Sequence, residues 1–177
     1  MEPYLDGITT VIASLEEQKS IIVGIADDLI QAKKAGRQIF ICGNGGSAAI
    51  ASHFANDLHK KEYNVWSLTD SVPSITMWAN DFNYNFVFAY QLQGRAHAGD
   101  ILIVFSGSGS SKNIIQACHY AHAFGMTTIA IVGIDGGACK QYQSNLNISK
   151  LIHLPVDMYH SEDGFSIFSH WITALVE

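Results

Sequence analysis

Two short turns rich in glycine and serine contain the residues best suited to bind a phosphate. The first spans 42–47 (CGNGGS). Its Gly45 and Gly46 allow a ligand to approach the backbone closely, Asn44 tolerates a left-handed conformation, and Ser47 offers a hydroxyl. The alternative is an ordinary tight turn between a strand and a helix, with Ser47 as the helix N-cap.

The second turn spans 106–111 (SGSGSS) and offers four hydroxyls in front of a predicted helix, whose N-terminal end attracts anions. Neither turn has the spacing of a P-loop, and 43–48 (GNGGSA) ends in Ala48 where a dinucleotide fingerprint usually has its third glycine. The pattern therefore favours a sugar phosphate over a nucleotide. A flexible serine-rich surface loop is the alternative.

Candidates for acid–base or metal chemistry lie on two predicted helices. His53 and Asp57 are four residues apart, so they share a helix face and could bind one metal ion or divide acid and base roles. A solvated pair on the helix surface is the alternative. His59 and Lys60 are expected to point elsewhere. His170 lies in an apolar helical segment, where a single histidine is more often a core residue than a ligand.

Hydrophobic patterning predicts the elements that position these residues. Helical spacing covers 4–35, which forms two helices or one bent helix, and it returns at 48–59, 112–124 and 162–176. Short apolar runs typical of strands are 38–42, 64–68, 100–105, 127–132 and 151–154. This alternation predicts an α/β fold, a three-layer α-β-α sandwich around a parallel sheet with leading N-terminal helices. The length fits one domain, 1–177.

Composition limits the function classes. A net charge of −6 disfavours sequence-independent binding to nucleic acid. The first residues do not have the pattern of an export signal, and no uncharged run is long enough to span a membrane, so we expect neither export nor insertion. Three cysteines far apart suggest no disulfide framework and fit a reducing cytoplasm. The 48% hydrophobic share exceeds the need of a lone domain and indicates a subunit interface.

Together, the two turns, the Asn80-Asp81 pair and the closing helix with His170 resemble the sugar isomerase (SIS) family, most closely its phosphoheptose isomerase branch. The resemblance implies that the serine loop binds the sugar's phosphate through Ser106, Gly107, Ser108 and Ser111. It implies that the rest of the substrate site is lined by Asn44, Gly45, Gly46, Ser47, Asn80 and Asp81. The zinc-site positions would be His53, Asp57, Glu162 and His170.

In this family the residues at Asp57 and His170 also serve as base and acid. The implied reaction is the aldose–ketose isomerisation of sedoheptulose 7-phosphate to D-glycero-D-manno-heptose 7-phosphate through an enediol, with zinc or another divalent ion polarising the carbonyl. The implied assembly is a homotetramer, with the leading helices packed between subunits.

Two positions depart from the family pattern. Asp57 stands where these isomerases usually carry Glu, and Glu162 where they carry Gln. In one continuous helix Glu162 and His170 would lie about 12 Å apart along the axis. We therefore expect either that Glu162 precedes the helix or that subunits share the site. The departures leave open a non-catalytic SIS protein with a regulatory or assembly role, or an isomerase of another phosphorylated sugar.

Overall fold

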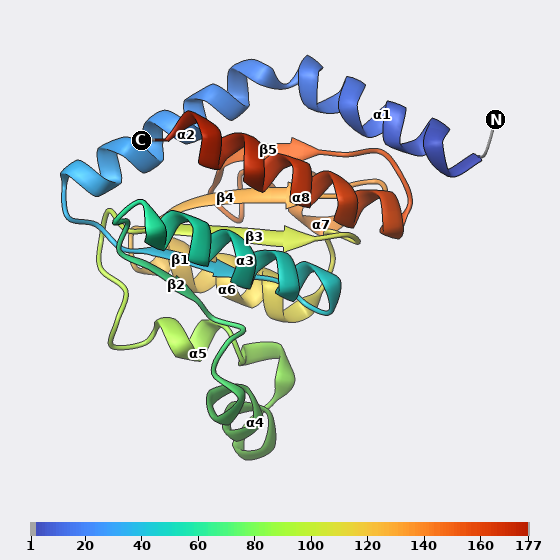
Figure 1. The fold of residues 1–177 in the computed structure, drawn as a ribbon. Coiled ribbons are helices and arrows are strands. Elements are labelled where there is room, and N and C mark those ends of the chain that lie inside the picture. Colours follow the sequence, from blue (N-terminus) through green and yellow to red (C-terminus); the bar gives the residue numbers. More distant parts are fainter. Residues whose placement is uncertain (1–2, 177) are drawn as a thin grey trace.

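The computed structural model describes residues 3–176, and its strands form one parallel sheet between two layers of helices (Figure 1). The strands are β1 (Ile39–Cys42), β2 (Val65–Ser67), β3 (Ile101–Ser106), β4 (Thr127–Val132) and β5 (Ile148–His153). Their spatial order is β2-β1-β3-β4-β5. The predicted three-layer α/β sandwich is confirmed.

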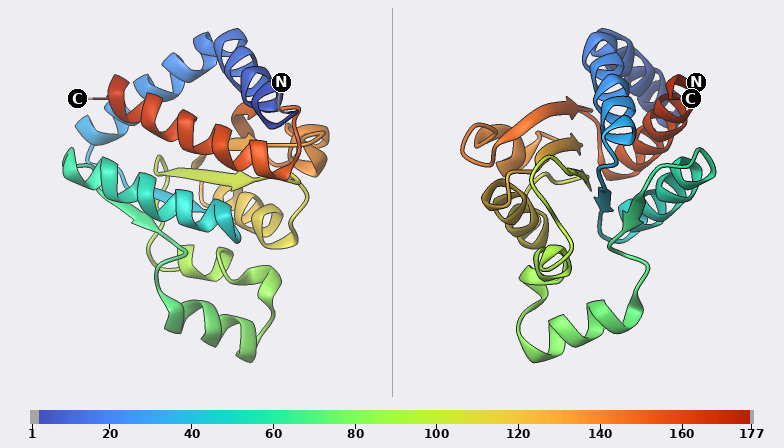
Figure 2. Two further views of the ribbon diagram at one scale, coloured as in Figure 1. Left: turned by 45° about the vertical axis from the view of Figure 1, so that its right-hand side comes forward. Right: turned by 90° about the vertical axis from the view of Figure 1, so that its left-hand side faces the viewer.

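Four long helices cover one face of this sheet: α1 (Pro3–Glu17), α2 (Lys19–Lys34), α3 (Gly46–Lys60) and α8 (Met158–Leu175). The other face is covered by α5 (Ala89–Leu92), α6 (Lys112–Ala123) and α7 (Gly137–Gln141). Side chains alternate along each strand, so Ile39 and Ile41 enter the first core while Phe40 and Cys42 enter the second. Figure 2 shows the two layers edge-on.

The leading helical segment breaks into two helices at Gln18, as one of the two predicted alternatives had it. The Gln18 side chain donates to the carbonyl of His153 at 2.8 Å and accepts from its backbone N–H at 2.9 Å. These bonds satisfy polar groups at the free edge of β5. The break is therefore fixed by contact with the sheet.

Strand β5 begins three residues before the predicted 151–154 segment. Its first residues include the polar side chains Ser149 and Lys150, which a strand at the edge of a sheet can accommodate. The Ser149 hydroxyl donates to the Thr128 carbonyl at 2.8 Å, and Lys150 pairs with Asp28 on α2. Tertiary contacts, which patterning cannot reveal, thus extend the strand.

An arm that patterning did not predict projects from the body between β2 and β3 (Figures 1 and 2). It contains α4 (Val72–Asp81) and the 3-10 turn η1 (Tyr84–Phe86). Ser71 caps α4, whose N–H at Ser74 donates to the Ser71 hydroxyl, and Pro73 suits the first turn. No residue of α4 is buried. Among the described helices, none has the length and apolar character needed to cross a membrane.

Candidate functional site

The first glycine turn connects β1 to α3 at the carboxyl edge of the sheet, where ligands bind in open parallel sheets. Gly45 has φ of +57°, a backbone conformation that side chains with a Cβ rarely adopt, and it is the N-cap of α3. Ser47 is buried inside the first turn of the helix and makes no capping hydrogen bond. The turn therefore differs from the ordinary serine-capped alternative.

Asn44 is held by Asn113, which the sequence analysis did not single out, and by Tyr84 of the arm. Its amide exchanges hydrogen bonds with the Asn113 side chain at 2.8 and 2.9 Å, and Tyr84 of the arm donates to its Oδ1 at 3.0 Å. Asn113 is buried in the first turn of α6. These bonds, rather than a left-handed backbone, fix Asn44. The available sequence signal for Asn113 was its position, two residues after the last serine of the loop.

The serine loop connects β3 to α6 and is also fixed by its backbone. Gly109 has φ of +61°, and a Cβ there would lie 2.0 Å from the Gly136 carbonyl oxygen. Ser106 and Ser108 accept from backbone N–H groups at 3.1 and 3.3 Å, which leaves their hydroxyl hydrogens to donate. Ser111, the N-cap of α6, makes no side-chain capping bond. The loop is therefore an ordered cradle of hydroxyl donors.

A cavity of about 80 Å³ lies between the two turns. Its walls include Asn44, Ser47, Ser106, Gly107, Ser108, Ser111, Met158 and Glu162. Among these described residues there is no Lys or Arg. An anion there depends on hydroxyls, backbone N–H groups and the positive N-terminal ends of helices α3 and α6.

Glu162 places a carboxylate against the first turn of α3. A Cβ at Gly46 would lie 2.2 Å from Glu162 Oε2, so Gly46 is the residue that allows this packing. The N-terminal end of a helix favours a negative charge. The Glu162 carboxylate therefore opposes a second negative charge at the end of α3, which leaves α6 and the serine hydroxyls as the stronger anion site.

Away from this cavity, His53, Asp57 and His170 meet where α3 packs beside α8 (Figure 2). The Nε2 atoms of His53 and His170 are 3.0 Å apart, and His53 Nε2 lies 3.3 Å from Asp57 Oδ2. Both histidines are exposed and Asp57 is half-buried. The structure thus brings together three of the four residues of the implied zinc site, here called the metal trio.

The donor set of the metal trio fits a divalent ion. Two imidazole nitrogens and a carboxylate are ligands that zinc accepts, with metal–nitrogen distances of about 2.0–2.1 Å. Tetrahedral ligands at that distance are separated by about 3.3 Å. The distances of 3.0 and 3.3 Å agree with this spacing, and all three ligand atoms lie within 4.8 Å of one another.

Lys60 was expected to point away from this cluster, and that expectation is wrong. Its Nζ lies 3.3 Å from Asp57 Oδ1, one helical turn along α3. Lys60 is exposed, so this ion pair is a surface contact beside the metal trio. Lys60 contacts Oδ1 of Asp57, and His53 lies next to the other carboxylate oxygen, Oδ2.

Glu162 does not join the metal trio within one chain. It lies inside α8, which begins at Met158 with Asp157 as its N-cap, so the alternative in which Glu162 precedes the helix is wrong. His170 is two turns further along the same helix, about 12 Å away. His53 is likewise about 10 Å along α3 from Gly46. The serine cavity and the metal trio are thus two separate groups in one chain.

Asn80 and Asp81 lie at the end of α4, on the projecting arm (Figure 1). Both are exposed, and the Asn80 amide donates to Asp81 Oδ1 at 2.9 Å. Neither residue lines the serine cavity of this chain. The arm instead contacts the wall of that cavity through Tyr84, which donates to Asn44.

Comparisons with known proteins identify the family of this chain. The family described as SIS domain matches residues 3–133. The chain is 40% identical over 125 residues to a probable phosphoheptose isomerase of Thermoplasma acidophilum, which covers 67% of this chain and 69% of that protein. It is 35% identical over 160 residues to the phosphoheptose isomerase of Mycobacterium tuberculosis, covering 86% and 79% respectively.

This chain belongs to the SIS-domain family, in its phosphoheptose isomerase branch. The solved phosphoheptose isomerase of Neisseria gonorrhoeae has the same fold, with a TM-score of 0.90 at 28% identity over 97% of this chain and 92% of that one. The similarity to that structure extends beyond the SIS match at residue 133, so this SIS protein shares the closing helix as well as both turns.

Other polar side chains of this SIS protein lie outside both groups. Burial raises the pKa of the Cys42 thiol, which does not suit a nucleophile. His160 Nδ1 lies 2.8 Å from Asp157 Oδ2 and its Nε2 lies 2.9 Å from the Tyr4 carbonyl. The Asp157 carboxylate raises the pKa of His160, which attaches α1 to the start of α8.

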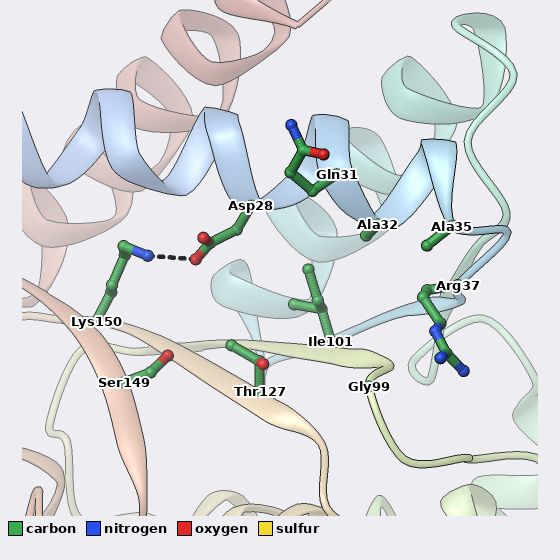
Figure 3. A pocket seen from close by; sticks show the side chains of 10 residues that line it. All are labelled: Asp28, Gln31, Ala32, Ala35, Arg37, Gly99, Ile101, Thr127, Ser149 and Lys150. Carbon is green, nitrogen blue, oxygen red and sulfur yellow. Dashed lines mark hydrogen bonds and ion pairs between the residues drawn. The ribbon is translucent and has the colours of Figure 1, made fainter.

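A larger cavity, of about 440 Å³, lies at the opposite edge of the sheet, at the amino ends of β3 and β4 (Figure 3). It is bounded by Arg37 and Gly99 at one end and by the Lys150–Asp28 pair at the other. None of the predicted site residues lines it. The candidate site is therefore the smaller serine cavity at the carboxyl edge together with the metal trio.

Proposed function

We propose that this isomerase converts sedoheptulose 7-phosphate to D-glycero-D-manno-heptose 7-phosphate. The observation that carries the proposal is the similarity to phosphoheptose isomerases over most of the chain, and the carboxylate–histidine group and the serine-lined cavity support it. Residues 1–177 would act as one SIS domain in each subunit.

The phosphate is proposed to bind in the serine cavity. Ser106, Ser108 and Ser111 have hydroxyl hydrogens that can donate to its oxygens, and the N-terminal end of α6 adds a favourable dipole. The cavity, at about 80 Å³, is too small for a whole heptose, so the sugar extends out of it. Binding energy at the phosphate orients the reacting carbons at the other end.

The chemistry is proposed to lie at the metal trio. The Asp57 carboxylate accepts the proton from C1 of the ketose, and the electrons of that C–H bond form the enediol double bond. The same carboxylate returns the proton to C2. His170 moves a proton between the two oxygens, because an imidazole donates and accepts near neutral pH. A zinc or other divalent ion held by His53, Asp57 and His170 would supply polarisation of the carbonyl.

The two groups are proposed to complete one another between subunits of a homotetramer. Within one chain they are separated along α3 and α8, and the metal trio is open to solvent. Exposed apolar side chains on the leading helices, such as Leu5 and Ile12, each 55% exposed, offer surface for such contacts. Asn80, Asp81 and Glu162 would then serve a neighbouring subunit's site. The buried free thiols suit a cytoplasmic location.

The direct test is NMR of sedoheptulose 7-phosphate with metal-free and zinc-loaded protein. We expect aldose signals with the wild type and none above background with Asp57→Ala or His170→Ala. Absence of turnover by the wild type would refute the proposal. Chemical-shift changes of sedoheptulose 7-phosphate without turnover would favour a non-catalytic SIS protein. Turnover of another phosphorylated ketose would instead favour an isomerase of a different sugar.

A mixing experiment tests the shared site. Ser106→Ala/Ser108→Ala protein and His170→Ala protein are each expected to be nearly inactive. Subunit exchange between them would restore activity if each site takes its cradle and its metal trio from different chains. No recovery in mixed oligomers, verified by mass measurement, would place the whole site in one chain.

A further inference from the structure

A third cavity, of about 480 Å³, opens between α3 and the edge strand β2, away from the serine cavity. Trp66 of β2 forms part of its wall and is 49% exposed. The indole N–H is already used, because it donates to Asn64 Oδ1 at 3.2 Å. What Trp66 offers to a ligand is therefore the apolar surface of its ring.

Asp70 gives the same cavity a fixed hydrogen-bond acceptor. The hydroxyls of Ser67 and Thr69 lie 2.9 and 3.2 Å from Asp70 Oδ1, and Ser52 of α3 donates to the same oxygen. Within the described residues, no donor contacts Oδ2. Three hydroxyls thus hold one carboxylate oxygen and leave the other available, which is preorganisation for a ligand's O–H or N–H groups.

Two further polar side chains come from α3. Asn56 and His59 follow Ser52 at helical spacing, so all three lie on one stripe of the helix. His53 and Asp57 of the metal trio occupy the neighbouring stripe. The cavity therefore lies beside the proposed reaction centre but has its own lining.

Charge narrows the class of ligand. Arg95 brings a guanidinium to the cavity, 6.0 Å from the Trp66 ring centre and at the outer limit of a cation–π contact. Asp70 opposes a strongly anionic ligand and Arg95 opposes a strongly cationic one. A polar lining with one exposed aromatic ring is also a poor match for an apolar peptide. The remaining class is neutral, ring-shaped and rich in hydroxyls.

We propose that this cavity binds an uncharged sugar ring, with its C–H face on Trp66 and its hydroxyls paired with Asp70 Oδ2 and Arg95. The proposal is independent of the isomerase reaction, because this sugar is a second ligand and not the phosphorylated substrate. It requires neither the serine loop nor the metal trio.

The test uses full-length protein labelled with 5-fluorotryptophan and ¹⁹F NMR. The chain has three tryptophans, so the Trp66 signal can be assigned with Trp66→Phe. The probes are methyl pyranosides of glucose, galactose, mannose and N-acetylglucosamine, with open-chain sorbitol as the control. We expect at least one pyranoside to shift the Trp66 signal saturably while the Trp78 and Trp171 signals stay in place.

Variants separate a site from a weak surface effect. Asp70→Asn should weaken binding about tenfold or more, since it removes the charge from the acceptor. Tyr142→Ala, which removes an exposed aromatic ring outside the cavity, should not change binding. Unshifted Trp78 and Trp171 signals show that each variant is folded. The proposal is overturned if no pyranoside shifts Trp66, if sorbitol shifts it equally, or if Asp70→Asn binds as well as wild type.

Discussion

The serine cavity and the metal trio are built by different means. The cavity is shaped by backbone: Gly45 and Gly109 adopt positive φ, and buried Asn113 holds Asn44. The metal trio is shaped by packing of α3 against α8, with exposed histidines on both helices. Substitutions in the serine cavity should therefore lower the free energy of unfolding or weaken substrate binding. Substitutions in the metal trio should lower only kcat.

The largest expected effect is at the metal trio. Asp57→Ala or His170→Ala should reduce kcat by roughly a hundredfold to ten-thousandfold, the range of general acid–base catalysis. KM and the melting temperature should change little, because His170 is exposed and half-buried Asp57 is paired with the exposed side chains of His53 and Lys60. Steady-state kinetics with calorimetry measures both. A large loss of stability would contradict the separation of chemistry from folding.

The next largest effect is at the serine loop. Gly109→Ala places a Cβ 2.0 Å from the Gly136 carbonyl oxygen on a backbone with positive φ. It should destabilise the fold by on the order of 2 kcal/mol. Chemical denaturation measures the free energy of unfolding. Gly36→Ala is the matched control, because Gly36 has φ of +65° with nothing within 4 Å of its Cβ, so it should cost less.

A substitution at Ser108 tests substrate binding separately from the stability of the fold. Ser108→Ala removes one hydroxyl donor from the proposed phosphate cradle and should raise KM about tenfold, since hydrogen bonds to charged groups are strong. The control is Ser110→Ala, because the Ser110 hydroxyl accepts from Ala138 N–H at 3.0 Å and is not assigned to the phosphate. Equal effects on KM would argue against the proposed cradle.

A smaller effect is expected at Glu162, which is on α8 but lines the serine cavity. Glu162→Gln removes a negative charge beside the proposed phosphate and should lower KM by a factor of about two to five. Asp163→Asn is the control, because Asp163 contacts Tyr4 rather than the cavity. An increase in KM with Glu162→Gln would indicate that the proposed role of Glu162 in a neighbouring subunit's site outweighs its repulsion of the phosphate.

The smallest effect concerns the start of α8. Asp157 raises the pKa of His160, and the carbonyl of Tyr4 and the carboxylate of Asp163 act in the same direction. Protonated His160 therefore stabilises the folded state. This stabilisation is complete below the pKa of His160 in the unfolded state and is lost as pH rises through the pKa of His160 in the folded state. Thermal unfolding from about pH 5 to about pH 9 should show wild type and His160→Asn converging as pH rises. A difference in melting temperature between the two proteins that stays constant with pH would contradict a stabilising role for protonated His160.

The sequence predicted what local patterning determines. Alternating strands and helices gave the three layers, and glycines and serines between a strand and a helix marked the cavity. The start of β5 at Ile148 was missed because its polar residues are satisfied by α2 and β4. The α4 arm was missed because its apolar stripe is short and only partly buried, with Ile75, Trp78 and Ala79 packed against the second core.

Site residues were predictable to different degrees. His53 and Asp57 share a face of one helix, so their spacing alone paired them. The approach of His170 depends on α3 lying beside α8, a contact between distant segments, and only family resemblance suggested it. Tyr84 lies on the arm, far from Asn44 in the sequence, yet it donates to the Asn44 side chain. Such roles follow from tertiary contacts that spacing does not contain.

The central claim is that a carboxylate and an imidazole at the metal trio move a proton on a phosphorylated ketose. The most direct measurement is NMR detection of solvent deuterium incorporation into sedoheptulose 7-phosphate in heavy water. Deuterium is expected at C1 with the wild type and with Ser110→Ala, and it should be absent with Asp57→Ala. Two results would contradict the proposed proton transfer. One is aldose formation by Asp57→Ala without deuterium incorporation, and the other is the absence of deuterium incorporation by the wild type.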